Sequence, residues 1–205
     1  MFNLKNEFIK HFKNNIFIYL SLTIVIMIGI SSGVITIKIM SEAQRSELSN
    51  FVTNFFQVLD KQEIQNTILL KNSILNNFKT SIIIWFMGII VIGIPITFSL
   101  ILFRGFTIGF SIGFMINNFG FKGFLLSFLT LTPQNIFIIP GLIIISSLST
   151  SYSINFIKNR KKIKKESILK EIISFSFFSF LTLLCFVIGG LIEAYITPYL
   201  LKIII

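Results

Sequence analysis

Few side chains in this sequence could carry out chemistry, and those few are isolated from one another. The only histidine is His11, and the only cysteine is Cys185, which lies in an apolar run. One cysteine cannot build a disulfide framework or a thiolate metal site within one chain, and one histidine without clustered carboxylates does not make a metal site. The sequence therefore predicts neither a metal nor a cofactor.

The motifs that accompany catalysis are also missing. The sequence has no zinc-binding HExxH pattern, no histidine near a candidate nucleophile, no glycine-rich loop that would cradle a phosphate and no ATPase motif. Its apolar segments contain no pair of aspartates that could work inside a membrane. These absences indicate that the protein is not an enzyme.

A polar interruption at Pro133, Gln134 and Asn135, followed by Pro140, stands out in the apolar second half of the chain. Proline cannot donate the helical hydrogen bond, and it disfavours helix in the residue before it. We therefore expect a helix break here, with the two amides satisfying the backbone groups that the break frees. Two alternatives remain open: a solute or ion site on a broken helix, as transporters use, and a contact with a partner.

Glu193 is the only acidic residue after Glu171, and it lies with Tyr195 and Pro198 at the end of the last apolar segment. A carboxylate inside a membrane marks a functional site by default. Tyrosine favours the membrane interface, so we expect Glu193 at the outer surface, with a specific polar partner as the alternative.

The elements that must position these residues are membrane helices. Apolar residues make up 54% of the 205-residue chain and charged residues only 13%, and the mean hydropathy is +0.86. A soluble domain carries about 25% charged residues, so a water-soluble core of this size is implausible. The sequence predicts an all-α, polytopic integral membrane protein that forms a single membrane domain over residues 1–205.

Five crossings follow from the apolar segments. Clear spans of about 20 residues run from Ile16 to Met40, from Ser81 to Phe103 and from Ile173 to Ala194, and the segment from Ile136 to Ile157 is also long enough to cross. The stretches 106–116 and 124–131 are too short for ordinary spans. We therefore expect broken or short helices in the 105–140 region, whose path can take more than one form without changing the total of five.

Lysine and arginine near the span ends predict the orientation, because they favour the cytoplasmic side. Residues 1–15 form a basic, amphipathic stretch in which His11 is interfacial; Arg104 follows the second span, and a basic loop at 158–171 follows the fourth. The N-terminus is thus expected inside and the C-terminus outside. The net charge of +10 then indicates contact with anionic lipid, and no nucleic acid, because the basic run has no interleaved aromatics.

The polar segment 41–80 is expected outside the membrane as a pair of amphipathic helices. An apolar stripe that includes Phe51, Val52, Phe55 and Phe56 recurs at helical spacing. Ser41 with Gln44, and Asp60 with Glu63, have the spacing of a capping box. The stripe is a candidate partner face; the alternative is that the two helices pack on each other or lie on the lipid surface.

Glycines at helical spacing predict close helix contacts. Gly105, Gly109 and Gly113 recur every four residues, and Gly29 and Gly33 form a second pair. Small residues let helix backbones approach closely in lipid. We expect packing within the chain, with contact between copies in a homo-oligomer as the alternative.

The stretch from Arg104 to Phe128, the residues Pro133 to Asn135, Pro140, and Glu193 to Tyr195 with Pro198 closely resemble the stage II sporulation protein M family. This resemblance implies a multi-pass protein of the cell membrane on the mother-cell side of the sporulation septum. It also implies a non-catalytic scaffold that recruits two peptidoglycan hydrolases, stage II sporulation proteins D and P, for septal wall thinning and engulfment. Segment 41–80 carries no family motif. The alternative function is a small channel or carrier with a broken helix at Pro133 to Asn135.

Overall fold

The protein is a bundle of long helices. The computed structural model describes residues 4–50, 66–90, 93–159, 165–197 and 199–200, and no strand occurs among them. The helices are α1 (Leu4–Asn14), α2 (Ile16–Ile39), α4 (Asn66–Ile89), α5 (Gly93–Asn159) and α6 (Lys165–Leu191), which continues into the π-helical turn η1 (Ile192–Ile196). Residues 42–50 are also helical. The all-α class predicted from composition is confirmed.

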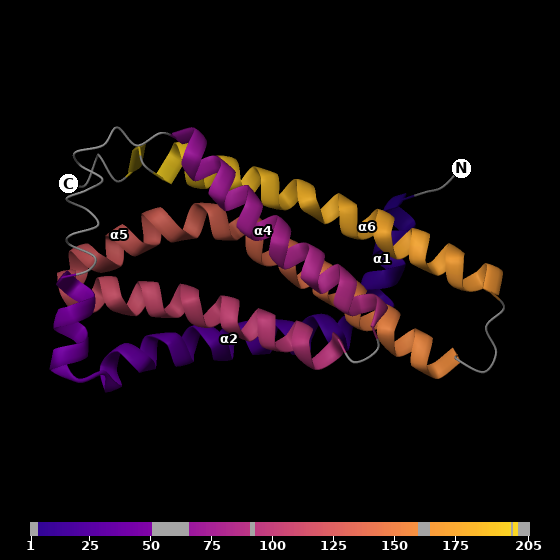
Figure 1. The fold of residues 1–205 in the computed structure, drawn as a ribbon, viewed down its shortest axis with the longest axis horizontal. Coiled ribbons are helices and arrows are strands. Elements are labelled where there is room, and N and C mark those ends of the chain that lie inside the picture. The colour runs from indigo at the N-terminus through magenta and orange to yellow at the C-terminus, as the bar shows by residue number, and fades with distance from the viewer. Residues whose placement is uncertain (1–3, 51–65, 91–92, 160–164, 198, 201–205) are drawn as a thin grey trace.

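Helix α5 is two helices joined at Gly120. The backbone of Gly120 has φ 56° and ψ −132°, the one non-helical conformation inside the 67 residues of α5. Only glycine adopts this region readily, because it has no Cβ to clash with the backbone. The first arm (residues 93–119) and the second arm (residues 121–159) therefore run in opposite directions, as Figure 1 shows.

Five helical passes alternate in direction along the bundle: α2, α4, the first and second arms of α5, and α6 (Figure 1). Within the described parts of the chain, three helical stretches are long and apolar enough to cross a membrane: Ile16–Ile39, Gly93–Lys158 and Ile172–Ile196. The second of these, with 66 residues, is far longer than the roughly 20 residues that one crossing needs. Its fold-back at Gly120 gives two passes. α4, whose first half is more polar, lies beside them.

The predicted span from Ser81 to Phe103 is wrong, because no single helix covers it. α4 ends at Ile89 and α5 begins at Gly93, whose backbone N–H donates to the carbonyl of Ile90 at 2.7 Å. A Cβ on Gly93 would lie 2.5 Å from the carbonyl carbon of Met87, so only glycine fits this turn. Pro95 follows in the first turn of α5, where its missing N–H costs no helical hydrogen bond.

The helix break expected at Pro133 is absent. α5 stays helical through Pro133 and Pro140, and the segments 124–131 and 136–157 are parts of one continuous second arm. Membrane helices tolerate proline where neighbouring helices and side chains compensate for the lost hydrogen bond. The break in the 105–140 region lies at Gly120 instead, where the backbone conformation itself requires glycine.

The N-terminal half agrees with its prediction in part. α2 covers the predicted first span to within a residue, and Ser41 begins the next helix through a capping box, with Ser41 N–H donating to Gln44 Oε1 at 3.1 Å and Gln44 N–H donating to Ser41 Oγ at 3.4 Å. The predicted boundary at Thr80 is not present, because residues 66–80 belong to α4. The second capping box and the apolar stripe lie outside the described residues.

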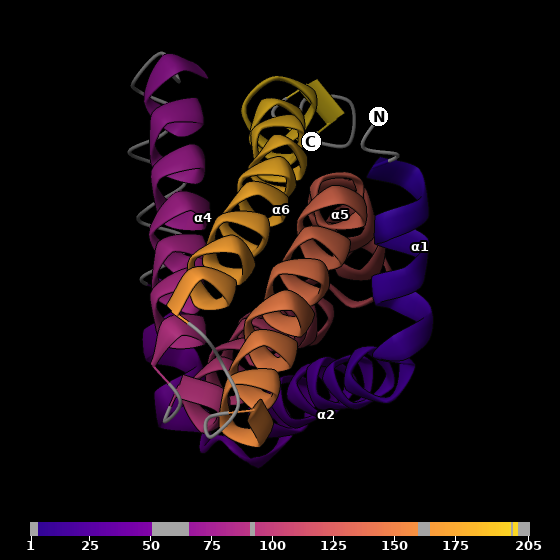
Figure 2. The same cartoon turned by 90° about the vertical axis from the view of Figure 1, so that its right-hand side faces the viewer.

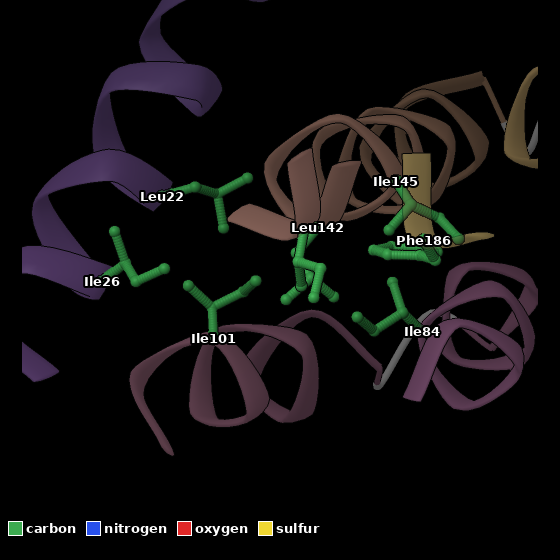
Figure 3. Close-up of a cluster of buried hydrophobic side chains, with 8 residues drawn as sticks. Leu22, Ile26, Ile84, Ile101, Leu142, Ile145 and Phe186 are labelled. Atoms are coloured by element: carbon green, nitrogen blue, oxygen red, sulfur yellow. The ribbon is translucent and has the colours of Figure 1, made fainter. Parts of the chain in front are cut away.

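One apolar cluster joins every pass of the bundle (Figure 3). It contains Leu22 and Ile26 of α2, Ile84 of α4, Ile101 of the first arm, Ile138, Leu142 and Ile145 of the second arm, and Phe186 of α6. Many large apolar side chains point outward instead, among them Phe103, Phe121 and Phe180. An apolar exterior of this kind suits contact with lipid.

Candidate functional site

A row of glycines brings α2 and the first arm of α5 into backbone contact. A Cβ on Gly105 would lie 3.2 Å from the Cα of Gly29, and a Cβ on Gly33 would lie 3.0 Å from the carbonyl carbon of Gly109. Gly113 continues the row, because a Cβ there would lie 3.1 Å from the Cα of Val34. We call these five glycines the glycine seam. The structure thus brings both predicted glycine sets together inside one chain.

A second seam, which the sequence analysis missed, joins the second arm of α5 to α4. Ser149 Oγ donates to the carbonyl of Ile84 at 2.9 Å, and Ser153 Oγ donates to the carbonyl of Gly88 at 2.7 Å. A Cβ on Gly88 would lie 3.1 Å from the Cα of Ser149. The six serine and threonine residues from Ser146 to Ser153 are all buried. This run of small hydroxyl residues in an apolar segment is the sequence feature from which a close helix contact could have been predicted.

Two adjacent glycines near the end of α6 bring that helix against both α4 and α5. A Cβ on Gly189 would lie 3.3 Å from the carbonyl oxygen of Gln134, and a Cβ on Gly190 would lie 3.0 Å from Ile74 Cγ1. The π-helical turn η1 follows at once and contains Glu193. Single π-turns of this kind often occur at functional sites.

Glu193 is partly buried and is bonded to α4. The hydroxyl of Ser73 donates to Glu193 Oε2, and Asn77 Nδ2 lies 3.5 Å from Ser73 Oγ. Both α4 side chains are buried, with exposed fractions of 7% and 3%. Thr197 Oγ1 donates to the carbonyl of Thr130 in the second arm at 3.4 Å. The end of α6 is therefore joined by polar contacts to α4 and α5, and Glu193 has the specific polar partner that the sequence analysis gave as the alternative.

Arg104 lies near the middle of the first arm, as its twelfth residue, and not at the inner end of a span as predicted. It lies about three helical turns after Gly93, because α5 begins at Gly93, inside the predicted span from Ser81 to Phe103. Its side chain is partly buried, its Nε is buried without a hydrogen-bond partner, and its charge interacts with that of Glu193. Opposite charges inside a membrane pair with each other because isolated ones are costly there.

Gln134 and Asn135 are both buried, each with an exposed fraction of 7%. Asn135 Nδ2 donates to the carbonyl of Leu131 at 2.8 Å. The carbonyl that Pro133 deprives of its helical partner belongs to Leu129, so the amide does not compensate for the proline as we expected. Gln134 Oε1 and Asn135 Oδ1 are buried and have no hydrogen-bond partner.

These side chains lie on the same side of the apolar cluster. Ile101 and Ile138 share the apolar cluster, and the two arms of α5 are antiparallel, so Arg104 and Gln134 lie on the same side of it, about one turn away. Asn77 precedes Ile84, and Glu193 follows Phe186, by seven residues each, or about two turns of the same helix face. We call Ser73, Asn77, Arg104, Gln134, Asn135 and Glu193 the polar layer.

The polar layer combines two opposite charges, Arg104 and Glu193, with neutral hydrogen-bonding groups. In the described part of the chain, no three histidine, cysteine or acidic side chains converge as a metal site would require. The unpaired Arg104 Nε can donate a hydrogen bond, and the unpaired Gln134 and Asn135 oxygens can accept one. The layer can therefore hold helices in register, or bind a polar group that reaches it.

The remaining predicted site residues lie outside this layer. Tyr195 is 51% exposed on the outer face of η1, and Pro140 is exposed on the second arm. Pro198 and the stripe residues Phe51, Val52, Phe55 and Phe56 lie outside the described residues. Among the described residues of the predicted polar and proline motifs, Gln134, Asn135 and Glu193 are the ones that belong to the polar layer.

No curated protein and no solved structure matches this chain. The family model described as stage II sporulation protein M matches residues 22–198, a range that begins inside α2 and includes α4, both arms of α5, α6 and η1. The match thus covers 177 of the 205 residues, including the whole glycine seam and the whole polar layer. The chain belongs to the stage II sporulation protein M family.

Proposed function

We propose that this chain is a non-catalytic membrane scaffold that recruits peptidoglycan hydrolases of the stage II sporulation protein D and P types to the sporulation septum. The hydrolases would thin the septal wall and permit engulfment, and the chain would act from the mother-cell membrane. The observation that carries this proposal is the family match over residues 22–198.

The family and the apolar helices together make this a sporulation-related membrane protein. The internal contacts support the finer role of a scaffold. The glycine seam, the serine contacts to α4 and the Ser73–Glu193 hydrogen bond each join different pairs of passes. A bundle whose helices are joined by several separate contacts is rigid. A rigid membrane protein that binds two partners raises their effective concentration near each other.

Purification from sporulating cells tests the proposal. The full-length protein should retain both hydrolases after detergent extraction and crosslinking. The variant Phe51→Ser with Phe55→Ser tests the apolar stripe as the docking face, and Asn50→Ser with Asn54→Ser is its control off the stripe. We expect the first variant to insert normally and lose the hydrolases, and the control to keep them. If the first variant keeps both hydrolases, the docking face lies elsewhere on the protein. If the wild type retains neither hydrolase, the scaffold proposal is wrong.

A small carrier or channel is the second candidate, and the unpaired oxygens of Gln134 and Asn135 favour it. Buried acceptors without partners can coordinate a passing cation or solute, as in transporters. Solute flux across proteoliposomes tests this candidate directly. A flux that requires Asn135, in a protein that retains no hydrolase, would replace the scaffold proposal.

A further inference from the structure

A cavity opens where α1 meets the start of α2 and the end of the second arm of α5. Its volume is about 540 Å³, and its lining includes Lys10, His11, Asn14, Asn155 and Lys158. Figure 2 shows α1 beside the second arm of α5, with α2 leading away from the lower end of α1. We call this space the N-terminal cavity; it is separate from the polar layer.

The corner between α1 and α2 is held in place by Asn15. Its side-chain Nδ2 donates to the carbonyl of His11 at 2.9 Å, and its Oδ1 accepts a hydrogen bond from Ser151 Oγ at 2.9 Å. Ser151 lies in the second arm of α5 and is buried. The two sides of the N-terminal cavity are therefore joined by a hydrogen bond. This bond fixes the position of α1 relative to the second arm of α5.

The charge that lines the N-terminal cavity is positive. Lys10 and Lys158 are exposed at its mouth, and none of its described lining residues carries a carboxylate. Burial lowers the pKa of His11, and its Nδ1 lies 3.4 Å from the Tyr19 hydroxyl. Two lysines without an acidic partner in the lining favour an anion.

The position of the N-terminal cavity matches the depth of lipid headgroups. α2 begins at Ile16, and the apolar stretch of α5 ends at Lys158. Apolar side chains line the same cavity beside the lysines: Phe17, which is 82% exposed, with Ile18 and Ile154. A lining that changes from basic to apolar at the end of a membrane span suits a molecule with an anionic head and an acyl chain.

We propose that the N-terminal cavity binds the phosphate-bearing headgroup of an anionic membrane lipid. Lys10 and Lys158 act as point charges for the phosphate, as lysine commonly does, and the amides of Asn14 and Asn155 donate hydrogen bonds to its oxygens. The acyl chain lies along Phe17 and Ile154. A free phosphate could contact the lysines and amides in the same way, but it has no apolar part to contact Phe17 and Ile154. The apolar part of the lining therefore favours a lipid as the ligand.

The test is a titration of the full-length protein in mild detergent with phosphatidylglycerol, read by native mass spectrometry, with phosphatidylcholine as the neutral lipid. Lys10→Gln and Lys158→Gln should each weaken phosphatidylglycerol binding about fivefold, and the double variant about 25-fold. Lys38→Gln is the matched control, because Lys38 lies in the last turn of α2 at the opposite end of that helix. It should leave binding unchanged.

Inorganic phosphate, added without lipid and in competition with it, separates the two sources of the anion. Phosphatidylglycerol retention that needs Lys10 and Lys158 and resists millimolar phosphate supports the proposal. Phosphate binding with the same lysine dependence, without lipid retention, would assign the cavity to a free anion and contradict the proposal that it binds a lipid. Equal binding of both lipids, or an equal loss in Lys38→Gln, would overturn the site itself.

Discussion

Ser73 and Glu193 are joined by a hydrogen bond although 120 positions separate them. The bond ties the polar first half of α4 to the π-helical turn after α6, and it holds the carboxylate whose charge interacts with Arg104. Because α4 is the least apolar of the passes, this contact gives it a partner inside the bundle. The polar layer therefore gives partners inside the bundle to the first half of α4, which the sequence analysis placed outside the membrane.

Removal of the Glu193 carboxylate should destabilise the protein. Glu193→Ala leaves the Ser73 hydroxyl and the Arg104 charge without their partner, at a typical cost of about 1–3 kcal/mol. We expect a lower midpoint of thermal unfolding in detergent. Glu193→Gln keeps an acceptor for the Ser73 hydroxyl, so its thermal midpoint should fall less than that of Glu193→Ala.

The charge interaction with Arg104 can be measured by adding Arg104→Gln to Glu193→Gln. If the charges are coupled, the double variant is more stable than the sum of the single effects predicts, by about 0.5–3 kcal/mol. Additive effects would show that Arg104 and Glu193 act independently, and the polar layer would then lack its charge pair.

Gly109→Leu should prevent the close approach of α2 and the first arm of α5. Even a Cβ at this position would lie 2.8 Å from the Cα of Ile30, and overpacking of this kind costs about 1–3 kcal/mol. Ile108→Leu, one residue along the same helix, is the control and should be close to wild type. Protein level and thermal midpoint in detergent measure both. Equal behaviour of the two variants would mean that the glycine seam does not limit stability.

Asn135→Leu should be nearly neutral for stability, within about 1 kcal/mol. The change removes the hydrogen bond to Leu131, but it also removes a buried oxygen that has no partner, and these two effects oppose each other. The helix has no break at Pro133 for the amide to repair. Under the scaffold proposal, hydrolase retention should also be unchanged. A stable Asn135→Leu protein that loses a wild-type solute flux would instead support the carrier.

Labelling of single cysteines tests the topology. In a Cys185→Ser background, a cysteine at Asn117, beside the Gly120 turn, should react with a reagent that cannot cross the membrane. A cysteine at Ile90, between α4 and α5, should not react in intact cells. A reporter active only outside the cell should likewise work near Asp60 or after Ile205 and be silent near Lys162. Reaction of the cysteine at position 90 in intact cells would contradict the expected orientation, in which the N-terminus lies inside the cell.

The sequence was sufficient for features that depend on neighbouring residues. The apolar run of α2, the capping box at Ser41 and the four-residue spacing of Gly105, Gly109 and Gly113 all involve contacts within a turn or two of one helix. Periodicity and composition report such contacts directly. The membrane class and the family motifs could therefore be predicted before any tertiary arrangement was known.

The tertiary structure decided where the helices break and which polar groups are buried. A proline disfavours helix locally, yet α5 continues through Pro133, whereas Gly120 folds it back. Arg104 reads as an interfacial charge until Glu193, 89 positions later, is placed where the two charges interact. The free energy of a buried charge, and of a helix break, depends on partners that other passes supply, and local sequence carries no record of which passes meet.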